Sequence, residues 1–250
     1  MFYKRVLVCI DDTDNLESIG TGKLAHIIIG EIEERGWGSC EAISRHQLYV
    51  HSEIPYTSHN SSMCFGVDLD GANLEHLINY AADFLIRESA AGSDPGLCVV
   101  VPEQLKEPER LIEFGFKAKG AVLTKKDAYQ LASQLGVHLS EHGGTGGGVI
   151  GALAGTGLRL SGNDGRLRGR LKIGSINDEV SVSDIKSQTI VNIVQSLDGQ
   201  MLNDHDLVRL GEKVKAVLMG GKVVMPVYPT DANNGGARWQ TCTKEQLKKF

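Results

Sequence analysis

The sequence predicts an α+β or α/β protein: a layered β-sheet with packed helices, then a smaller α+β unit for which a ferredoxin-like arrangement is one candidate. Five consecutive apolar residues at 6–10, bounded by polar ones, are typical of a strand buried on both faces at the centre of a sheet. Strand-like and helix-like segments alternate through the first hundred residues. With 250 residues and 41% hydrophobic content, the chain can bury a large core as one domain or two. We divide it into residues 1–170 and 171–250.

The elements of the first part follow from hydrophobic periodicity and turn residues. Apolar side chains recur at helical spacing over residues 24–35, and Gly36 ends that helix. By the same criteria we expect strands at 41–50, 63–69 and 97–101, helices at 73–89 and 125–135, a polar loop at 51–62 and a turn at 93–96.

The second part has a less regular pattern. An apolar stretch at 185–197 predicts a helix, and Asp198-Gly199 predicts a turn. We expect a further helix at 206–218 and a strand at 222–227. For the tail, residues 228–250, two interpretations stay open: it folds over a functional site, or it is a mobile end.

Composition narrows the class of protein. A net charge of -5 and a pI near 5.9 argue against a protein that coats nucleic acid through bulk charge. No apolar run approaches the ~20 residues that span a bilayer, and the N-terminus lacks the apolar region of a signal peptide. We therefore expect a cytoplasmic protein with no membrane partner.

The five cysteines are widely spaced and include no C-x-x-C pair. This pattern indicates neither a disulfide framework nor a zinc ribbon. Cys9, Cys64 and Cys98 lie in apolar runs, where a cysteine is usually a small buried hydrophobic residue.

Three carboxylates, Asp11, Asp12 and Asp14, follow the predicted central strand. They lie at its C-terminal end, where open α/β sheets place ligands. Crowded carboxylates repel one another unless a cation lies between them, and Mg²⁺ takes one or two carboxylates together with water and substrate phosphates. The alternative is a solvated acidic turn, because aspartate favours turns and helix N-caps.

A glycine-rich segment at 143–148 precedes an apolar run that can form a helix. Glycines leave backbone N–H groups bare, and the N-terminus of a helix attracts anions. The segment therefore indicates a phosphate loop, although a glycine-rich hinge or lid is the alternative. The residues predicted to bind a phosphate-bearing cofactor are Gly144, Thr145, Gly146, Gly147 and Gly148.

Arginines gather just downstream, at Arg166, Arg168 and Arg170. In a strand their alternation would place them on one face, where they could clamp phosphates. A solvated strand face is the alternative.

Two glycine motifs match known patterns only in part. The run 20–23 resembles the end of a Walker A loop, but Glu17 stands where the pattern needs glycine and Leu24 where it needs serine or threonine. The run 146–151 fits G-x-G-x-x-G, yet helix-like sequence precedes it where a dinucleotide site needs a buried strand.

His138, Glu141 and His142 match H-x-x-E-H, which on a continuous helix would hold zinc for a hydrolase. Glycines follow at once, so little helix remains to hold that geometry. The alternative is a helix end with histidines near its C-terminal carbonyls.

Four stretches occur in a fixed order over roughly the first 160 residues, and each adds an independent constraint. In this order they resemble the archaeal tRNA-isoleucine agmatidine synthetases, which modify the wobble cytidine of an isoleucine tRNA with ATP and agmatine. The stretches are Ile10-Asp11-Asp12-Thr13-Asp14 with Thr21 and Leu24-Ala25, Ile54-Pro55-Tyr56 with Asn60, Asp94-Pro95-Gly96, and the glycine-rich run that ends at Ile150-Gly151-Ala152-Leu153-Ala154.

The resemblance implies an ATP-dependent, kinase-like domain that phosphorylates an oxygen to make it a leaving group. It implies that Asp11, Asp12 and Asp14 bind Mg²⁺ and the ATP phosphates, with Thr13 in the cofactor site. Thr21 would correspond to the family's phosphorylatable threonine. Whether Asp12 or Asp14 instead accepts the proton of the nucleophile stays open.

The family also has an oligonucleotide-binding barrel and a zinc ribbon that grip tRNA, and this chain has no cysteine pair for zinc. The family's glycine-rich loop carries basic residues where this chain has glycine and Thr145, and the three downstream arginines would replace that charge. With a net charge of -5, we expect tRNA as a substrate only if a partner supplies RNA-binding parts.

The sequence therefore predicts a Mg²⁺- and ATP-dependent enzyme of the kinase or synthetase type, acting on a small-molecule or nucleobase-like acceptor. The main alternative is a non-catalytic, nucleotide-binding regulatory protein, and a metal hydrolase is a third. The oligomeric state stays open, with a homodimer compatible with the sequence.

Overall fold

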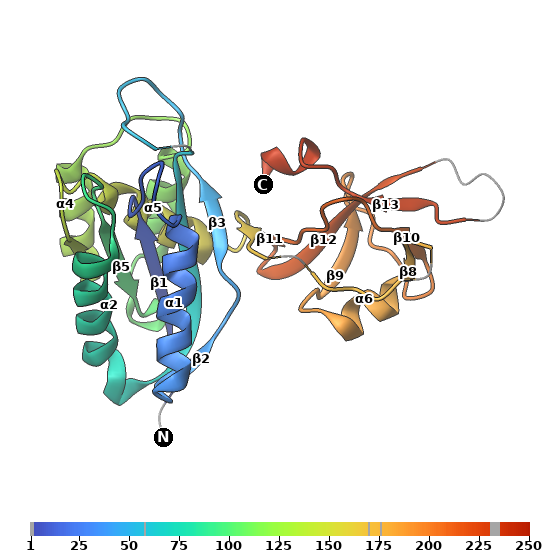
Figure 1. Cartoon of the computed structure of the whole chain (residues 1–250), viewed down its shortest axis with the longest axis horizontal. Coiled ribbons are helices and arrows are strands. Elements are labelled where there is room, and N and C mark those ends of the chain that lie inside the picture. Colours follow the sequence, from blue (N-terminus) through green and yellow to red (C-terminus); the bar gives the residue numbers. More distant parts are fainter. Residues whose placement is uncertain (1–2, 58, 170, 176, 231–235) are drawn as a thin grey trace. The chain divides into compact units, whose positions relative to one another are not determined.

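The computed structural model describes the chain except residues 1–2, 58, 170, 176 and 231–235. The chain forms two compact units, Met1–Ser161 and Gly162–Phe250 (Figure 1). Residues 162–170 therefore belong with the second unit. No helix among the described residues is long and apolar enough to cross a membrane.

The first unit is built on an antiparallel sheet with the strand order β6-β5-β1-β4-β3, and β2 also pairs with β4. β1 lies in the middle, and its apolar residues from Val6 to Ile10 are at most 3% exposed, which confirms the predicted central strand. The strands are β1 (Tyr3–Asp11), β2 (Gly38–Cys40), β3 (Ser44–Gln47), β4 (Ser61–Asp70), β5 (Gly96–Val100) and β6 (His138–Glu141).

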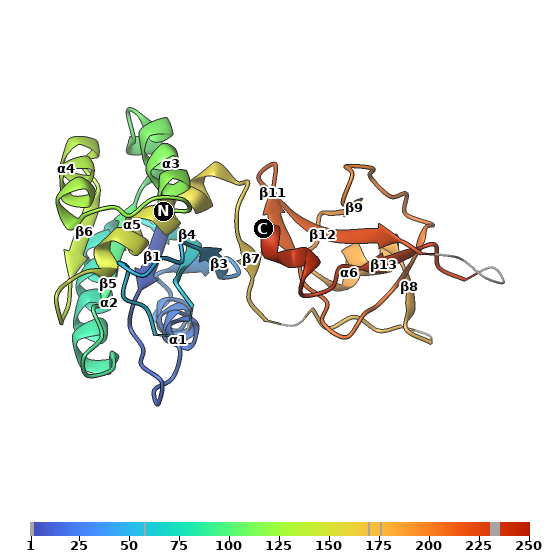
Figure 2. The same ribbon diagram turned by 90° about the horizontal axis from the view of Figure 1, so that it is seen from above.

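Helices cover both faces of this sheet, so the unit has three layers (Figure 2). Val6, Val8 and Ile10 of β1 pack against α1 and α2, whereas Leu7 and Cys9 pack against α3, α4 and α5. This is why both alternating faces of β1 are apolar. The helices are α1 (Thr21–Glu34), α2 (Leu74–Glu88), α3 (Pro108–Lys117), α4 (Lys125–Leu135) and α5 (Gly148–Ser161), with short 3-10 turns at Gly71–Asn73 and Pro102–Gln104.

The predicted class, a layered sheet with packed helices, is confirmed. The expectation that ligands bind at the C-terminal ends of the strands does not apply to this sheet. That expectation holds for parallel strands, which all end at one edge. Here β1 pairs antiparallel with β4 and β5, so these two neighbours begin at the edge where β1 ends. The carboxylates therefore meet the starts of strands as well as their ends.

The second unit consists mainly of strands, in the order β7-β11-β12-β13-β10-β8, with β9 parallel to β12. Its described residues form one α-helix, whereas a ferredoxin-like unit needs two. The elements are β7 (Arg166–Leu167), β8 (Glu179–Ser181), α6 (Val182–Gln188), β9 (Ile193–Ser196), β10 (Leu207–Arg209), β11 (Val217–Met219), β12 (Lys222–Pro229), β13 (Trp239–Thr241) and a 3-10 turn at Gln246–Lys249.

Two predicted helices in this unit were wrong. The stretch 185–197 divides into the end of α6 and strand β9, and the stretch 206–218 contains β10 and the start of β11. In β10 only the middle residue, Val208, is buried, which is the alternation of a strand. The predicted strand at 222–227 is confirmed as β12. The tail supplies β13, which pairs with β10 and β12, so its described end is part of this unit's sheet.

In the first unit, the helices predicted at 24–35, 73–89 and 125–135 are present as α1, α2 and α4. Of the strand predicted at 41–50, only Ser44–Gln47 forms a strand, β3, and the separate short strand β2 lies before the predicted range. Helix α3 and strand β6 were not predicted. All five cysteines are free, and Cys9, Cys64 and Cys98 are fully buried as expected.

Candidate active site

One edge of the first sheet gathers the polar segments that the sequence singled out. Asp11, the last residue of β1, pairs with Gly96 at the start of β5, and Gly96 in turn pairs with Glu141 at the end of β6. The acidic turn, the Asp94-Pro95 turn and the glycine-rich loop therefore leave the sheet side by side. Helix α5 begins directly after that loop.

Asp11 is only 8% exposed, because its carboxylate lies against the first turn of α5. A Cβ atom on Gly151 would lie 1.7 Å from Oδ2 of Asp11, so only glycine fits at that position of the helix. Burial raises the pKa of Asp11 to about 8, and the charges of Asp12 and Asp14 contribute to this rise.

Asp12 has a left-handed backbone conformation, with φ of 50°, which turns the chain sharply after β1. Burial raises its pKa to about 6, and the negative charges of Asp94 and Asp14 add to the rise. Four carboxylates therefore share this edge, and they repel one another when all are ionised.

Asp94 is the member of this group that the sequence analysis did not assign to the site. It is 8% exposed, and its two carboxylate oxygens accept hydrogen bonds from the N–H and the hydroxyl of Thr145. Its carbonyl accepts from the N–H of Gly148 at 3.0 Å. Asp94 thus ties the acidic edge to the glycine-rich loop. The signal was the Asp-Pro-Gly sequence directly before a buried strand.

The glycine-rich loop has a defined shape. Gly144 and Gly146 have φ values of 56° and 76°, and a Cβ atom on either would collide with a carboxylate oxygen of Asp94 or Glu141. The N–H groups of Thr145, Gly146 and Gly148 already donate within the protein. Among the described residues of the loop, those of Gly143, Gly144 and Gly147 make no hydrogen bond, so fewer N–H groups are free than the sequence indicated.

Asp14 of the acidic turn contacts helix α1 and Thr57 of the polar loop. The backbone N–H of Thr21 lies 3.3 Å from Oδ2 of Asp14, and the hydroxyl of Thr57 donates to the carbonyl of Asp14 at 3.0 Å. Thr21 is the first residue of α1 and is 6% exposed. Thr13 is fully buried, and its Oγ1 has no hydrogen-bond partner in the described structure.

Solved structures share the fold of part of this chain. TiaS, in its complex with an isoleucine tRNA and ATP, is 27% identical in sequence to this chain, with a TM-score of 0.53. The match covers 62% of this chain and 36% of the TiaS chain. The resemblance to agmatidine synthetase is confirmed.

Two further TiaS structures agree with this match. Apo TiaS, named as an agmatidine synthetase of isoleucine tRNA, is 26% identical with a TM-score of 0.53, covering 61% of this chain and 35% of TiaS. TiaS with the tRNA, AMPCPP and agmatine is 26% identical with a TM-score of 0.51, covering 61% and 36%. The chain thus spans little more than a third of the length of TiaS. No family model and no curated protein matches the chain.

The acidic edge of the first sheet offers oxygen ligands of the kind that Mg²⁺ takes. No group of three or more His, Cys, Asp or Glu side chains in the described part of the chain is placed to hold a metal ion. Mg²⁺ needs only one or two carboxylates, and Asp12 lies within the field of Asp94 and Asp14. These carboxylates are the hard oxygen donors that Mg²⁺ prefers, so the residues present fit the ion, and the buried hydroxyl of Thr13, between Asp12 and Asp14 in the chain, has no hydrogen-bond partner among the described residues. The assignment of Asp11, Asp12 and Asp14 as ligands stays a prediction.

The arginine segment lies in the other unit. Arg166 is in β7 and Arg168 follows it, while Arg170 lies outside the described residues. The acidic turn, Asp94 and the glycine-rich loop all lie in the first unit. Because β7 has two residues, the described part of this segment is too short to align three arginines on one strand face. Their contact with phosphates stays a prediction.

The hypothesis of a zinc hydrolase was wrong. His138 and Glu141 lie in strand β6, where the sequence analysis placed a helix end. Nε2 of His138 and Nε2 of His142 each lie within 2.9 Å of the hydroxyl of Ser140, whereas Glu141 pairs with Lys125. Alternation along the strand places Glu141 opposite the histidines, so the three side chains do not converge on one ion.

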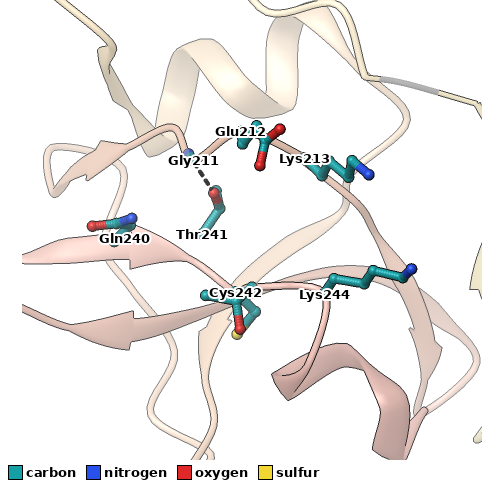
Figure 3. A pocket seen from close by; sticks show the side chains of 8 residues that line it. Gly211, Glu212, Lys213, Gln240, Thr241, Cys242 and Lys244 are labelled. Atoms are coloured by element: carbon teal, nitrogen blue, oxygen red, sulfur yellow. Dashed lines mark hydrogen bonds between the residues drawn. The ribbon is translucent and has the colours of Figure 1, made fainter.

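A hollow of about 310 Å³ lies in the second unit, between the loop after β10 and the segment that follows β13 (Figure 3). The N–H of Gly211 donates to Oγ1 of Thr241 at 2.8 Å across it, and Lys213 and Lys244 extend from its rim. Its lining has a single carboxylate, Glu212, and no glycine-rich loop. The carboxylate cluster and the glycine-rich loop therefore belong to the first unit.

Proposed function

We propose that the first unit binds ATP with Mg²⁺ and transfers a phosphoryl group to an oxygen of a small-molecule or nucleobase-like acceptor. The observation that carries the proposal is the meeting of four carboxylates with the glycine-rich loop at one edge of the sheet. The similarity to a TiaS structure that contains ATP supports it. Because the match covers 36% of TiaS, its tRNA and agmatine are carried over only as candidate substrates.

The roles of the residues follow from their positions. Asp12 and Asp14 would hold the ion, and Asp94 would link it to the loop. The free N–H groups of Gly143, Gly144 and Gly147 would bind phosphate oxygens near the positive end of the α5 dipole, since the N–H groups that begin α5 already donate within the protein. The hydroxyl of Thr13, which has no partner in the described structure, would donate a hydrogen bond to the bound nucleotide. When bound, Mg²⁺ neutralises charge on the transferred phosphate, and the protein contributes mainly positioning.

Asp11 and Thr21 have separate proposed roles. Asp11, with a pKa near 8, is mostly protonated at neutral pH, so it would accept the proton of the attacking hydroxyl through its ionised fraction, which grows as the pH rises toward 8. Thr21 lies at the N-terminus of α1, where a phosphate on its hydroxyl would meet the positive end of the helix dipole. Its 6% exposure means that phosphorylation would require α1 or the acidic turn to open.

The proposed magnesium site is tested by removing the negative charge of Asp12, whose backbone conformation asparagine can also adopt. Asparagine adopts left-handed φ values readily, so Asp12→Asn removes the charge with little backbone cost. Asp178→Asn is a matched control, because Asp178 also has a left-handed φ, of 61°, and is exposed in the second unit. Titration calorimetry with ATP and Mg²⁺ should show that Asp12→Asn lowers the affinity for ATP about tenfold. Asp178→Asn should leave this affinity unchanged.

A second function, nucleotide binding without turnover, is favoured by one observation. Several loop N–H groups, together with the N–H and the hydroxyl of Thr145, already donate within the protein, so fewer donors remain to stabilise charge on a transferred phosphate. Incubation with γ-labelled ATP and resolution of nucleotides and labelled protein separates the two functions. ADP or labelled Thr21 supports phosphoryl transfer, and binding without product supports the regulatory function. If the unaltered protein binds no ATP, both are wrong.

A further inference from the structure

Lys125 stands at an unusual place for a cation. It is the first residue of α4, directly after the N-cap Thr124, where the helix dipole favours negative charge. Thr124 and Asp127 complete the capping box without it. Lys125 therefore adds nothing to the start of the helix, and its position needs another reason.

The side chain of Lys125 extends from α4 to the glycine-rich loop. Its Nζ donates to the carbonyl of Thr145 at 2.7 Å and pairs with the carboxylate of Glu141, the last residue of β6. A Cβ atom on Gly146 would lie 1.4 Å from Oε2 of Glu141 and 2.6 Å from Nζ of Lys125. Both charged groups therefore lie directly against the loop backbone.

Thr145 is consequently held from two sides. Asp94 accepts hydrogen bonds from its N–H and its hydroxyl, and Lys125 donates to its carbonyl. Gly144 and Gly146 on either side have left-handed φ values and would bend freely without these contacts. All polar groups of Thr145 are engaged, so its position fixes the course of the loop.

We propose that Lys125 is a positioning residue, which holds the glycine-rich loop in the shape that receives nucleotide phosphates by bonding the Thr145 carbonyl. The inference rests on the proposed function. Glu141 orients the ammonium group toward the loop, and the pKa of Lys125 is raised, first by its hydrogen bond to Glu141, so the charge persists at neutral pH. The cation also offsets the negative charge of a nucleotide next to a carboxylate-rich edge.

Three variants of the full chain test this role. Lys125→Met keeps the aliphatic stem and removes the charge, and Lys125→Arg keeps the charge and the donors. Lys126→Met is the matched control, because Lys126 is the next residue on α4 and is exposed. The Lys125 side chain is 37% exposed, so none of these changes should prevent folding.

Two measurements are made on each variant: ATP affinity in the presence of Mg²⁺, and amide hydrogen exchange of Thr145, Gly146 and Gly148 without nucleotide. Lys125→Met should weaken ATP binding about tenfold and should speed exchange of these amides by a similar factor. Lys125→Arg should restore both to within about threefold, and Lys126→Met should change neither. Rescue by arginine separates positioning by charge from simple packing.

The two proposals fail in different ways. If the unaltered protein binds ATP and Lys125→Met matches it in affinity and exchange, the role of Lys125 is overturned and the proposed function stands. If the unaltered protein binds no ATP, the proposed function is wrong, and the exchange measurement then shows whether Lys125 orders the loop.

Discussion

At the scale of single residues, Asp11 combines a structural cost with a proposed catalytic role. Its carboxylate lies against the backbone of α5 with 8% exposure, and its pKa is near 8. Between pH 4 and pH 8 the folded protein therefore binds more protons at Asp11 than the unfolded chain does. The contribution of Asp11 to the free energy of unfolding therefore falls as the pH rises through this range. Above pH 8 this contribution is constant.

The first prediction is that Asp11→Asn stabilises the metal-free protein at pH 8, because the neutral amide has no charge to desolvate. The gain should be on the order of 2 kcal/mol at pH 8 and should disappear near pH 4. Urea unfolding of the variant and the unaltered protein at several pH values measures this difference. A gain that does not change with pH would show that Asp11 is not the buried titrating group.

Asp94 shows why part of the site was not predictable from sequence. Aspartate before Pro95 is ordinary turn chemistry, and nothing local indicates that it faces Asp12 and Thr145. Their meeting depends on the register of β5 against β1, which pairs residues 85 to 93 positions apart in the chain, from Asp11 with Gly96 to Leu7 with Val100. Asp11, Asp12 and Asp14 were recognisable because their crowding is itself local.

At the scale of elements, α5 packs on its neighbours through the backbone of its glycines as well as through apolar side chains. A Cβ atom on Gly148 would lie 2.1 Å from the carbonyl oxygen of Asp94, and one on Gly155 would lie 2.2 Å from Oγ of Ser62. A Cβ on Gly157 would lie 2.0 Å from the carbonyl of Leu111 in α3. The glycines of α5 thus allow close packing along the length of the helix.

The second prediction compares two helical glycines. Gly151→Ala should destabilise the protein by about 1–3 kcal/mol and weaken ATP binding, because the new methyl group collides with the Asp11 carboxylate. Gly30→Ala in α1 should stabilise it by about 0.5–1 kcal/mol, since no atom lies within 4 Å of its added Cβ. Denaturant unfolding measures both changes. Equal gains would contradict the packing of α5 on Asp11.

The accuracy of the predicted elements follows from how local their signals are. Helix α4 was predicted with its observed bounds because a capping box at Thr124 and a left-handed Gly136 mark its two ends. Strand β6 was missed because its four residues depend on pairing with β5, and H-x-x-E-H suggested a helical period. The strands β10 and β11 were taken for a helix for the same reason: three residues each carry too little periodicity.

At the scale of the whole molecule, charge is divided unequally between the units. Residues 1–161 carry 21 acidic and 13 basic side chains, and residues 162–250 carry 10 acidic and 13 basic. The first unit therefore has a net charge of -8 and repels free ATP, which is itself an anion.

The third prediction is that ATP binding depends on Mg²⁺ and becomes too weak to measure when EDTA is present. Removing the cation leaves a polyanion facing four carboxylates and an acidic unit. Calorimetry with and without EDTA checks this. Affinity that is equal in both conditions would mean that the nucleotide does not contact the acidic edge.

The fourth prediction concerns the fragment 1–161. Both apolar clusters of the first unit lie within it, so it should fold by itself and unfold cooperatively. If the site is complete in this unit, the fragment should bind ATP within about threefold of the full chain. A folded fragment with much weaker binding would instead support phosphate contacts by Arg166, Arg168 and Arg170.

Strand β6 has a consequence for behaviour at high concentration. It stands at one end of the strand order in the first unit, has four residues, and carries two polar side chains and a charge: His138, Ser140 and Glu141. A long apolar edge strand offers a template on which copies add to one another as continuous β-structure. This short polar edge offers little to pair with, so β-type aggregation should not begin there.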